Sequence, residues 1–158
     1  MHPGSSPVSV ASVVLLLAGS WAGVLIAASY ISGWASLARV YREPVVFSGD
    51  RWSFQTAQMR WFINYSNCLT VGANPVGLYV STLFLFRIAH PPLFVPWTDV
   101  SLTRKKVLWS KVAELRLGRE LLVPFRIGER LAQRLAAAAA GSWPCLLYTS
   151  PSPRDRTR

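Results

Sequence analysis

Residues 69–86 read LTVGANPVGLYVSTLFLF and predict a β-hairpin. Two runs of apolar and β-forming residues flank the segment Asn74-Pro75-Val76-Gly77. Proline at the second place of a four-residue turn and glycine at the fourth are typical of a type I turn. We therefore expect an antiparallel strand pair whose second strand continues through Phe86.

Strand patterns continue on both sides of this hairpin. Residues 52–61 are too polar for a buried helix and carry β-formers along their length, so they predict one strand or two short ones. After the prolines of His90-Pro91-Pro92, residues 93–95 predict a short strand. Residues 107–117 end in a clean alternation and predict another, joined by a turn at 118–120 to a partner at 121–125. We expect roughly five to seven strands.

The hydrophobic period becomes helical only near the end of the chain. Apolar residues recur every fourth position at Ile127, Leu131 and Leu135, beside a stripe of Arg126, Arg130 and Arg134, and a run of alanines follows. The sequence thus predicts an α+β fold in which a small antiparallel β-rich domain is closed by a C-terminal amphipathic helix.

The N-terminal region predicts a membrane anchor. Residues 8–31 lack charge, and at ~1.5 Å per residue they reach about 36 Å, more than the ~30 Å of a hydrocarbon core. Trp34 and Tyr41 follow at positions suited to the membrane interface. Ala27-Ala28-Ser29 leaves a cleaved signal peptide as the alternative, although no Lys or Arg precedes the apolar run, which is long for a signal peptide.

Charge predicts the orientation of the anchor. Arg39, Arg42 and Arg51 follow the apolar run, whereas only His2 and the terminal amine precede it. The positive-inside tendency then places the domain in the cytoplasm of a single-pass inner-membrane protein. Lone Cys68 gives no reason to expect a disulfide, since the other cysteine, Cys145, belongs to a tail discussed below.

Composition argues against several classes of protein. The chain has 158 residues, 51% of them hydrophobic and 15% charged, with a net charge of +10, which excludes a disordered chain and a multidomain enzyme. No catalytic, metal or cofactor motif occurs. His90 is expected to be a turn residue, and Asp99 to accept backbone hydrogen bonds at a turn. An enzyme, the alternative, would need a polar pocket built from Asp99, His90 and Tyr79.

The strongest functional prediction concerns a cationic loop. Arg104, Lys105 and Lys106 lie close together in the sequence, with Lys111 beyond them, and beside a bilayer each can gain on the order of 1 kcal/mol from anionic headgroups. The structural alternative is a solvated hairpin whose lysines keep strand edges from pairing. We do not expect nucleic-acid binding, since the positive-inside rule explains part of the charge, and no protein partner is indicated.

Two parts of the chain resemble known sequences. The stretches GLYVS at 77–81, FLFR at 84–87 and PPLFVPWTDV at 91–100 resemble membrane-anchored bacterial proteins with a pleckstrin-homology-like (PH-like) or GRAM-like domain, which implies a binding or scaffolding module without catalytic residues. Residues 145–158 resemble a translated sequencing adapter. We divide the chain into an anchor at 1–42, the β-rich PH-like domain at 43–140 and a non-native or disordered tail at 141–158.

Overall fold

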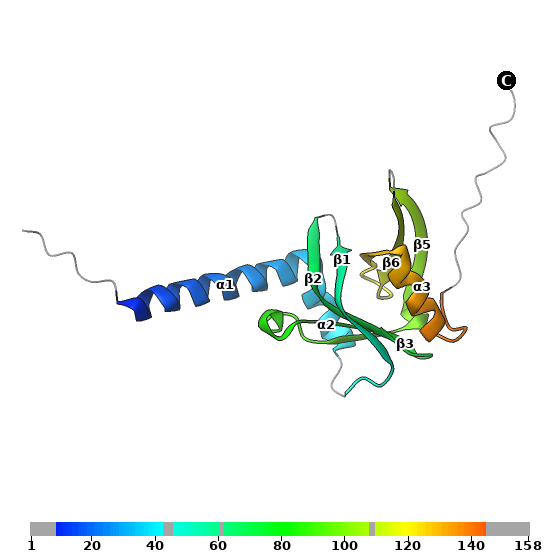
Figure 1. The fold of residues 1–158 in the computed structure, drawn as a ribbon, viewed down its shortest axis with the longest axis horizontal. Helices are drawn as coiled ribbons and strands as arrows, with labels where there is room; N and C mark the ends of the chain where they lie inside the picture. Colours follow the sequence, from blue (N-terminus) through cyan, green and yellow to red (C-terminus); the bar gives the residue numbers. More distant parts are fainter. Residues whose placement is uncertain (1–8, 43–45, 61, 108–109, 145–158) are drawn as a thin grey trace, which may run out of the picture.

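A computed structural model describes residues 9–42, 46–60, 62–107 and 110–144 of the chain. Its long first helix, α1 (Val10–Ser32), extends away from a sheet domain (Figure 1). Gly33 ends α1 with a φ of 82°, and α2 (Trp34–Tyr41) starts immediately after it. The adapter-like residues 145–158 lie outside the described part, so their resemblance stays a prediction.

Seven strands in the described residues form one antiparallel sheet, in the order β4-β3-β2-β1-β7-β6-β5. They are β1 (Asp50–Met59), β2 (Ile63–Ala73), β3 (Gly77–Thr82), β4 (Leu93–Pro96), β5 (Val100–Val107), β6 (Ser110–Leu117) and β7 (Val123–Gly128). Short 3-10 helices η1 (Phe84–Phe86) and η2 (Trp97–Asp99) precede β4 and β5, and α3 (Glu129–Ala138) follows β7. The predicted α+β class, antiparallel sheet and C-terminal helix are confirmed.

Strand β1 joins the two halves of the sheet. It pairs with β2 from Asp50 to Met59 and with β7 through Ala57–Met59. Its register with β2 is irregular between Trp52 and Ala57, and such bulges bend a strand and increase its twist. The sheet therefore curls into an open barrel, and η2 connects the outermost strands, β4 and β5.

The predicted hairpin at residues 69–86 is present, but its second strand is shorter than expected. The turn is closed by the Asn74 side chain, whose Oδ1 accepts hydrogen bonds from the amides of Val76 and Gly77 at 2.9 Å each. Pairing ends where Leu69 faces Thr82. Residues 84–86 form η1 instead of strand, because beyond that point the amides bond locally, as from Phe86 to the Leu83 carbonyl at 2.9 Å.

Side chains from the sheet and from the helices α2 and α3 share one core. From α2 this core receives Trp34 and Leu37, both fully buried, and from α3 it receives Leu131 and Leu135. Trp34 is therefore not an interfacial residue, contrary to the sequence prediction, because its ring packs inside the domain and its indole Nε1 donates to the Pro91 carbonyl at 2.9 Å. The packed domain thus includes α2, the helix that follows α1.

Three further predictions need correction. The basic residues at 104–106 lie within strand β5 and not in a loop, because β5 and β6 pair from Val100 to Val107. The strand β7 begins at Val123, two residues later than predicted, since Leu122 adopts a φ of 40° in the preceding turn. Arg126 lies on β7, where it pairs with Glu114, and so does not belong to the arginine stripe of the helix.

Candidate functional site

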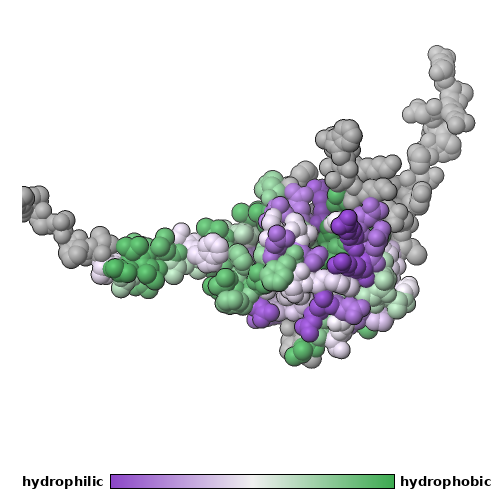
Figure 2. Space-filling model, viewed as in Figure 1, coloured by the Kyte–Doolittle hydropathy of each residue, from purple (hydrophilic) through white to green (hydrophobic). Residues whose placement is uncertain are grey.

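The surface of α1 is apolar and uncovered over most of its length. Leu15, Leu16 and Leu17 are all exposed, and among the described helices α1 alone is long and apolar enough to cross a membrane. Figure 2 shows hydrophobic side chains along this helix, with charged surface gathered on the domain. In a soluble chain this apolar area would remain in water, at a free-energy cost of about 25 cal/mol per Å² relative to burial.

The last turns of α1 are packed into the domain. Leu25 and Ser29 are buried, and the Ser29 hydroxyl donates to the Ala89 carbonyl at 2.6 Å. Higher up, the ring of Trp21 lies 5.6 Å from that of Phe86 on η1. The loop that contains η1 therefore lies alongside the C-terminal half of α1.

This loop presents apolar side chains outward. Phe84 is 74% exposed and Ile88 67% exposed, and Leu85 between them is also exposed. Together with Trp21 of α1, whose ring lies next to that of Phe86, they form an apolar surface, named here the loop face and defined by Trp21, Phe84, Leu85, Phe86 and Ile88. Patches of this kind on a soluble surface mark contact with a protein or a membrane.

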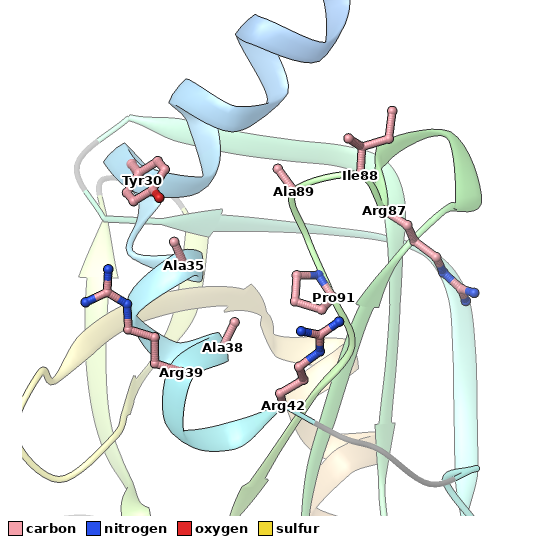
Figure 3. Close-up of a pocket in the computed structure, with 9 residues that line it drawn as sticks. All are labelled: Tyr30, Ala35, Ala38, Arg39, Arg42, Arg87, Ile88, Ala89 and Pro91. Carbon is pink, nitrogen blue, oxygen red and sulfur yellow. The ribbon is translucent and has the colours of Figure 1, made fainter.

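An open groove of about 540 Å³ lies beside the loop face, between the end of α1, the helix α2 and residues 87–91 (Figure 3). Three arginines line it: Arg39 and Arg42 from α2 and its C-terminal cap, and Arg87 from the loop. An isolated bridge between Arg42 and Leu93 holds the end of α2 against β4. Small side chains, Ala35 and Ala38, form part of the wall and leave the space open.

The groove is strongly cationic. Among the described residues, no carboxylate forms an ion pair with any of its three arginines, whereas Arg116, Arg119 and Arg126 each have one. The Nε of Arg87 donates to the Thr82 carbonyl at 3.4 Å, which leaves its terminal nitrogens available. The arrangement suits an anionic group such as a phosphate, because guanidinium groups bind phosphate oxygens through paired hydrogen bonds.

A buried polar cluster fixes the junction between α1 and the domain. The Tyr65 hydroxyl lies 2.9 Å from His90 Nε2 and donates to the Ser32 hydroxyl oxygen at 3.1 Å. Burial raises the pKa of Tyr65 to about 12 and lowers the pKa of His90. Both groups are therefore neutral near pH 7. The rings of Trp34 and Tyr65 enclose the imidazole, so the cluster is structural and holds the helix end in place.

Asp99 belongs to a second cluster. Its carboxylate accepts from the Tyr41 hydroxyl at 2.8 Å, from Arg119 Nε at 2.6 Å and from the Thr98 hydroxyl at 3.1 Å. The hydrogen bond from Arg119 lowers the pKa of Asp99, and burial raises the pKa of Tyr41. Asp99 thus has a structural role, although its carboxylate bonds side chains where backbone amides were expected.

The structure does not bring together His90, Asp99 and Tyr79, the residues expected to form the polar pocket of an enzyme. His90 contacts Tyr65, Asp99 contacts Tyr41, and Tyr79 stacks on Phe47 at 4.7 Å between ring centroids. The described residues also contain no cluster of three His, Cys, Asp or Glu side chains that could hold a metal ion. Cys68 is half-buried, and burial raises the pKa of its thiol, so it lacks the character of a nucleophile.

The structure places the predicted basic residues on the β5–β6 hairpin. Arg104 and Lys105 face Ala113 and Val112 across the strands, and Lys106 faces Lys111. β5 is an edge strand, where lysines often prevent pairing with other chains. In Figure 1 this hairpin lies farther from α1 than η1 does. Sequence reasoning missed the groove, because its arginines come together only when residues 87–91 fold against α2.

The chain is therefore an α+β protein with one candidate membrane span. It combines the apolar helix α1, a curled antiparallel sheet and a cationic groove where the two meet. Comparison of the chain with family models, curated proteins and solved structures found no match.

Proposed function

We propose that the chain is a non-enzymatic, membrane-anchored binding module of PH-like shape. In this proposal α1 crosses the inner membrane once, and the sheet domain lies on the cytoplasmic side against anionic lipid headgroups. The observation that carries it is the apolar surface that continues from α1 onto the loop face. A seven-stranded antiparallel sheet followed by a C-terminal helix supports the PH-like assignment.

The packing of α1 supports an uncleaved anchor over a signal peptide. Cleavage after Ser29 would remove Leu25 from the domain surface and break the hydrogen bond from Ser29 to Ala89. A signal peptide is removed from the mature protein, so specific packing of its C-terminal end against the folded domain is not expected.

The length of α1 indicates how deeply the domain lies in the bilayer. From Val10 to Trp21 the helix rises only ~17 Å, about half of a ~30 Å hydrocarbon core. Trp21 contacts η1, so a bilayer that α1 crosses must also surround Phe84, Leu85 and Ile88. The exposed side chains Phe84, Leu85 and Ile88 are apolar and suit lipid, whereas the charged side chain of Arg87, in the same loop, lines the groove. The domain would therefore be partly immersed in one leaflet.

Spin labelling of the full-length chain in liposomes tests this depth. With Cys68 and Cys145 replaced by serine, one variant carries the label at Leu85→Cys and a matched variant carries it at exposed Thr98→Cys. We expect the label at 85 to collide with dissolved oxygen, which concentrates in lipid, and to be shielded from a water-soluble nickel chelate. The label at 98 should show the reverse. Equal access of the chelate to both labels would refute the proposed membrane placement.

The basic hairpin remains a prediction within this proposal. Arg104, Lys105, Lys106 and Lys111 add positive charge to a domain held near the bilayer, where each cationic side chain can add about 1 kcal/mol of attraction. Changing the first three to serine should weaken the preference of the protein for anionic lipid if they touch headgroups. The enzyme alternative gains no support, because in the described part of the chain no cluster combines a catalytic acid, a base and an open cavity.

A further inference from the structure

We propose that the groove between α1, α2 and residues 87–91 binds the phosphate headgroup of an anionic phospholipid, through Arg39, Arg42 and Arg87. This inference rests on the proposed membrane placement and names the ligand that the domain binds there. It assigns the headgroup contact to a defined site at the foot of the anchor, distinct from the hairpin of strands β5 and β6.

The position of the groove matches the level of lipid headgroups. Tyr30, in the last turn of α1, and Ile88, on the loop face, are both exposed and both line the groove. Apolar side chains on one wall would therefore contact acyl chains, while the arginines on α2 lie past the end of the apolar helix. Aromatic residues are enriched at this depth, where hydrocarbon meets headgroup.

The charges of the groove favour a phosphate. Its guanidinium groups come from two separate elements, and Figure 3 shows that of Arg42 beside Pro91, with those of Arg39 and Arg87 on either side and directed away from it. Arg39 lies on α2 and Arg42 follows its last residue, so both approach the groove from the end of this helix. These three cations have no carboxylate partners among the described residues, so an anion that enters the groove meets no competing negative charge there.

The size and shape of the groove fit a headgroup attached to a membrane-bound lipid. The volume of about 540 Å³ exceeds what one phosphate needs, and the groove is open at the surface, so a glycerol-linked phosphate can enter from the leaflet. Ala35 and Ala38 line the groove with methyl groups, where longer side chains would fill it. A binding site for soluble ligands would instead be expected to bury most of the ligand.

Lipid selectivity of the full-length protein tests this site. The protein is reconstituted in phosphatidylcholine bilayers that contain spin-labelled phosphatidylglycerol or spin-labelled phosphatidylcholine, and the motionally restricted fraction of each lipid gives their relative association constants. We expect the wild type to prefer phosphatidylglycerol by about fivefold or more, since a single cation in contact with an anionic headgroup contributes about 1 kcal/mol, which is roughly this factor. The variant Arg39→Gln/Arg42→Gln/Arg87→Gln should reduce this preference to about one.

Two matched variants separate a site from general attraction. Arg51→Gln/Arg130→Gln/Arg134→Gln removes the same charge from exposed arginines of β1 and α3 and should keep the preference. Arg104→Ser/Lys105→Ser/Lys106→Ser tests the hairpin separately and should lose less of the preference than the glutamine groove variant. A groove variant with three lysines should retain part of the preference, because lysine keeps the charge but loses the planar fork.

Each outcome decides the matter. Loss confined to the glutamine groove variant supports the site, whereas equal losses in all three charge-reduced variants overturn it in favour of diffuse attraction. A wild-type preference abolished by excess inorganic phosphate at constant ionic strength would identify a soluble phosphate as the occupant and overturn the lipid source. If the groove variant keeps its preference while the label at residue 85 remains in lipid, the site is wrong and the membrane placement stands.

Discussion

Replacing Trp34 tests whether α2 is part of the sheet domain. The side chain is 0% exposed, and a buried tryptophan removes roughly 150–250 Å² from water. At about 25 cal/mol per Å² this corresponds to ~4–6 kcal/mol as an upper bound. Because large-to-small changes of aromatic core residues generally cost ~3–5 kcal/mol, we expect Trp34→Ala to lower the free energy of unfolding by about that amount.

A milder change isolates the hydrogen bond of the indole. Trp34→Phe keeps an aromatic ring in the core but removes the donor that bonds the Pro91 carbonyl at 2.9 Å. An unsatisfied buried carbonyl costs about 1–3 kcal/mol, so this variant should fall between Trp34→Ala and the wild type. The two variants together separate the contribution of packing from that of the hydrogen bond.

Urea unfolding of the full-length chain in nonionic micelles provides the measurement. The micelle covers α1, so the change in far-ultraviolet circular dichroism with urea reports on the sheet domain. Trp21→Ala is the matched control, because Trp21 is 49% exposed on α1, and it should cost less than ~1 kcal/mol. A loss for Trp34→Ala no greater than that for Trp21→Ala would refute the inclusion of α2 in the core.

Three further predictions use the same unfolding assay. Burial keeps the pKa of folded His90 below its ordinary value of 6.5, so the unfolded state binds more protons and the free energy of unfolding falls as the pH drops through 6.5. His90→Gln should therefore lose less stability than the wild type between pH 7 and pH 5, and equal losses would contradict this. Arg126→Met removes the guanidinium that lies 2.9 Å from the Glu114 carboxylate, and because Glu114 is only 2% exposed the change should cost about 1–3 kcal/mol of stability. Arg116→Met is the control and should cost under ~1 kcal/mol, because the Nε of Arg116 lies 3.6 Å from Glu114. Gly33→Ala places a Cβ 3.0 Å from Arg60 Nε at a φ of +82° and should cost about 1–2 kcal/mol, whereas Gly23→Ala meets open space and should cost nothing measurable.

Local chemistry made much of the fold predictable. The turn at Asn74–Gly77 depends on residues within four positions of one another, and the structure contains it. The same holds for the long apolar helix, since its length and lack of charge are properties of one continuous segment. Strand β5 escaped prediction because three basic residues in a row indicate a loop, although Val100 and Leu102 before them alternate inward and are buried.

The remaining features depend on contacts between distant segments. Arg126 has helical spacing to Arg130, and only the pairing of β6 with β7 shows that its partner is Glu114. His90 is a turn residue by sequence, but the packing of α2 against the sheet encloses it. The groove likewise unites the end of α2 with residues 87–91, which lie about 50 positions away, and no local pattern indicates that meeting.

The single residue between α1 and α2 determines how the domain can move. Many anchored domains hang from a long linker and search a hemisphere of solution, but here Ser32 and Trp34 are both buried on either side of Gly33. With α1 in a bilayer, the domain has no tether length and tilts only as the anchor tilts. Any macromolecular partner must therefore come to the membrane surface, and encounters between two copies of this chain are confined to diffusion in the plane of the lipid.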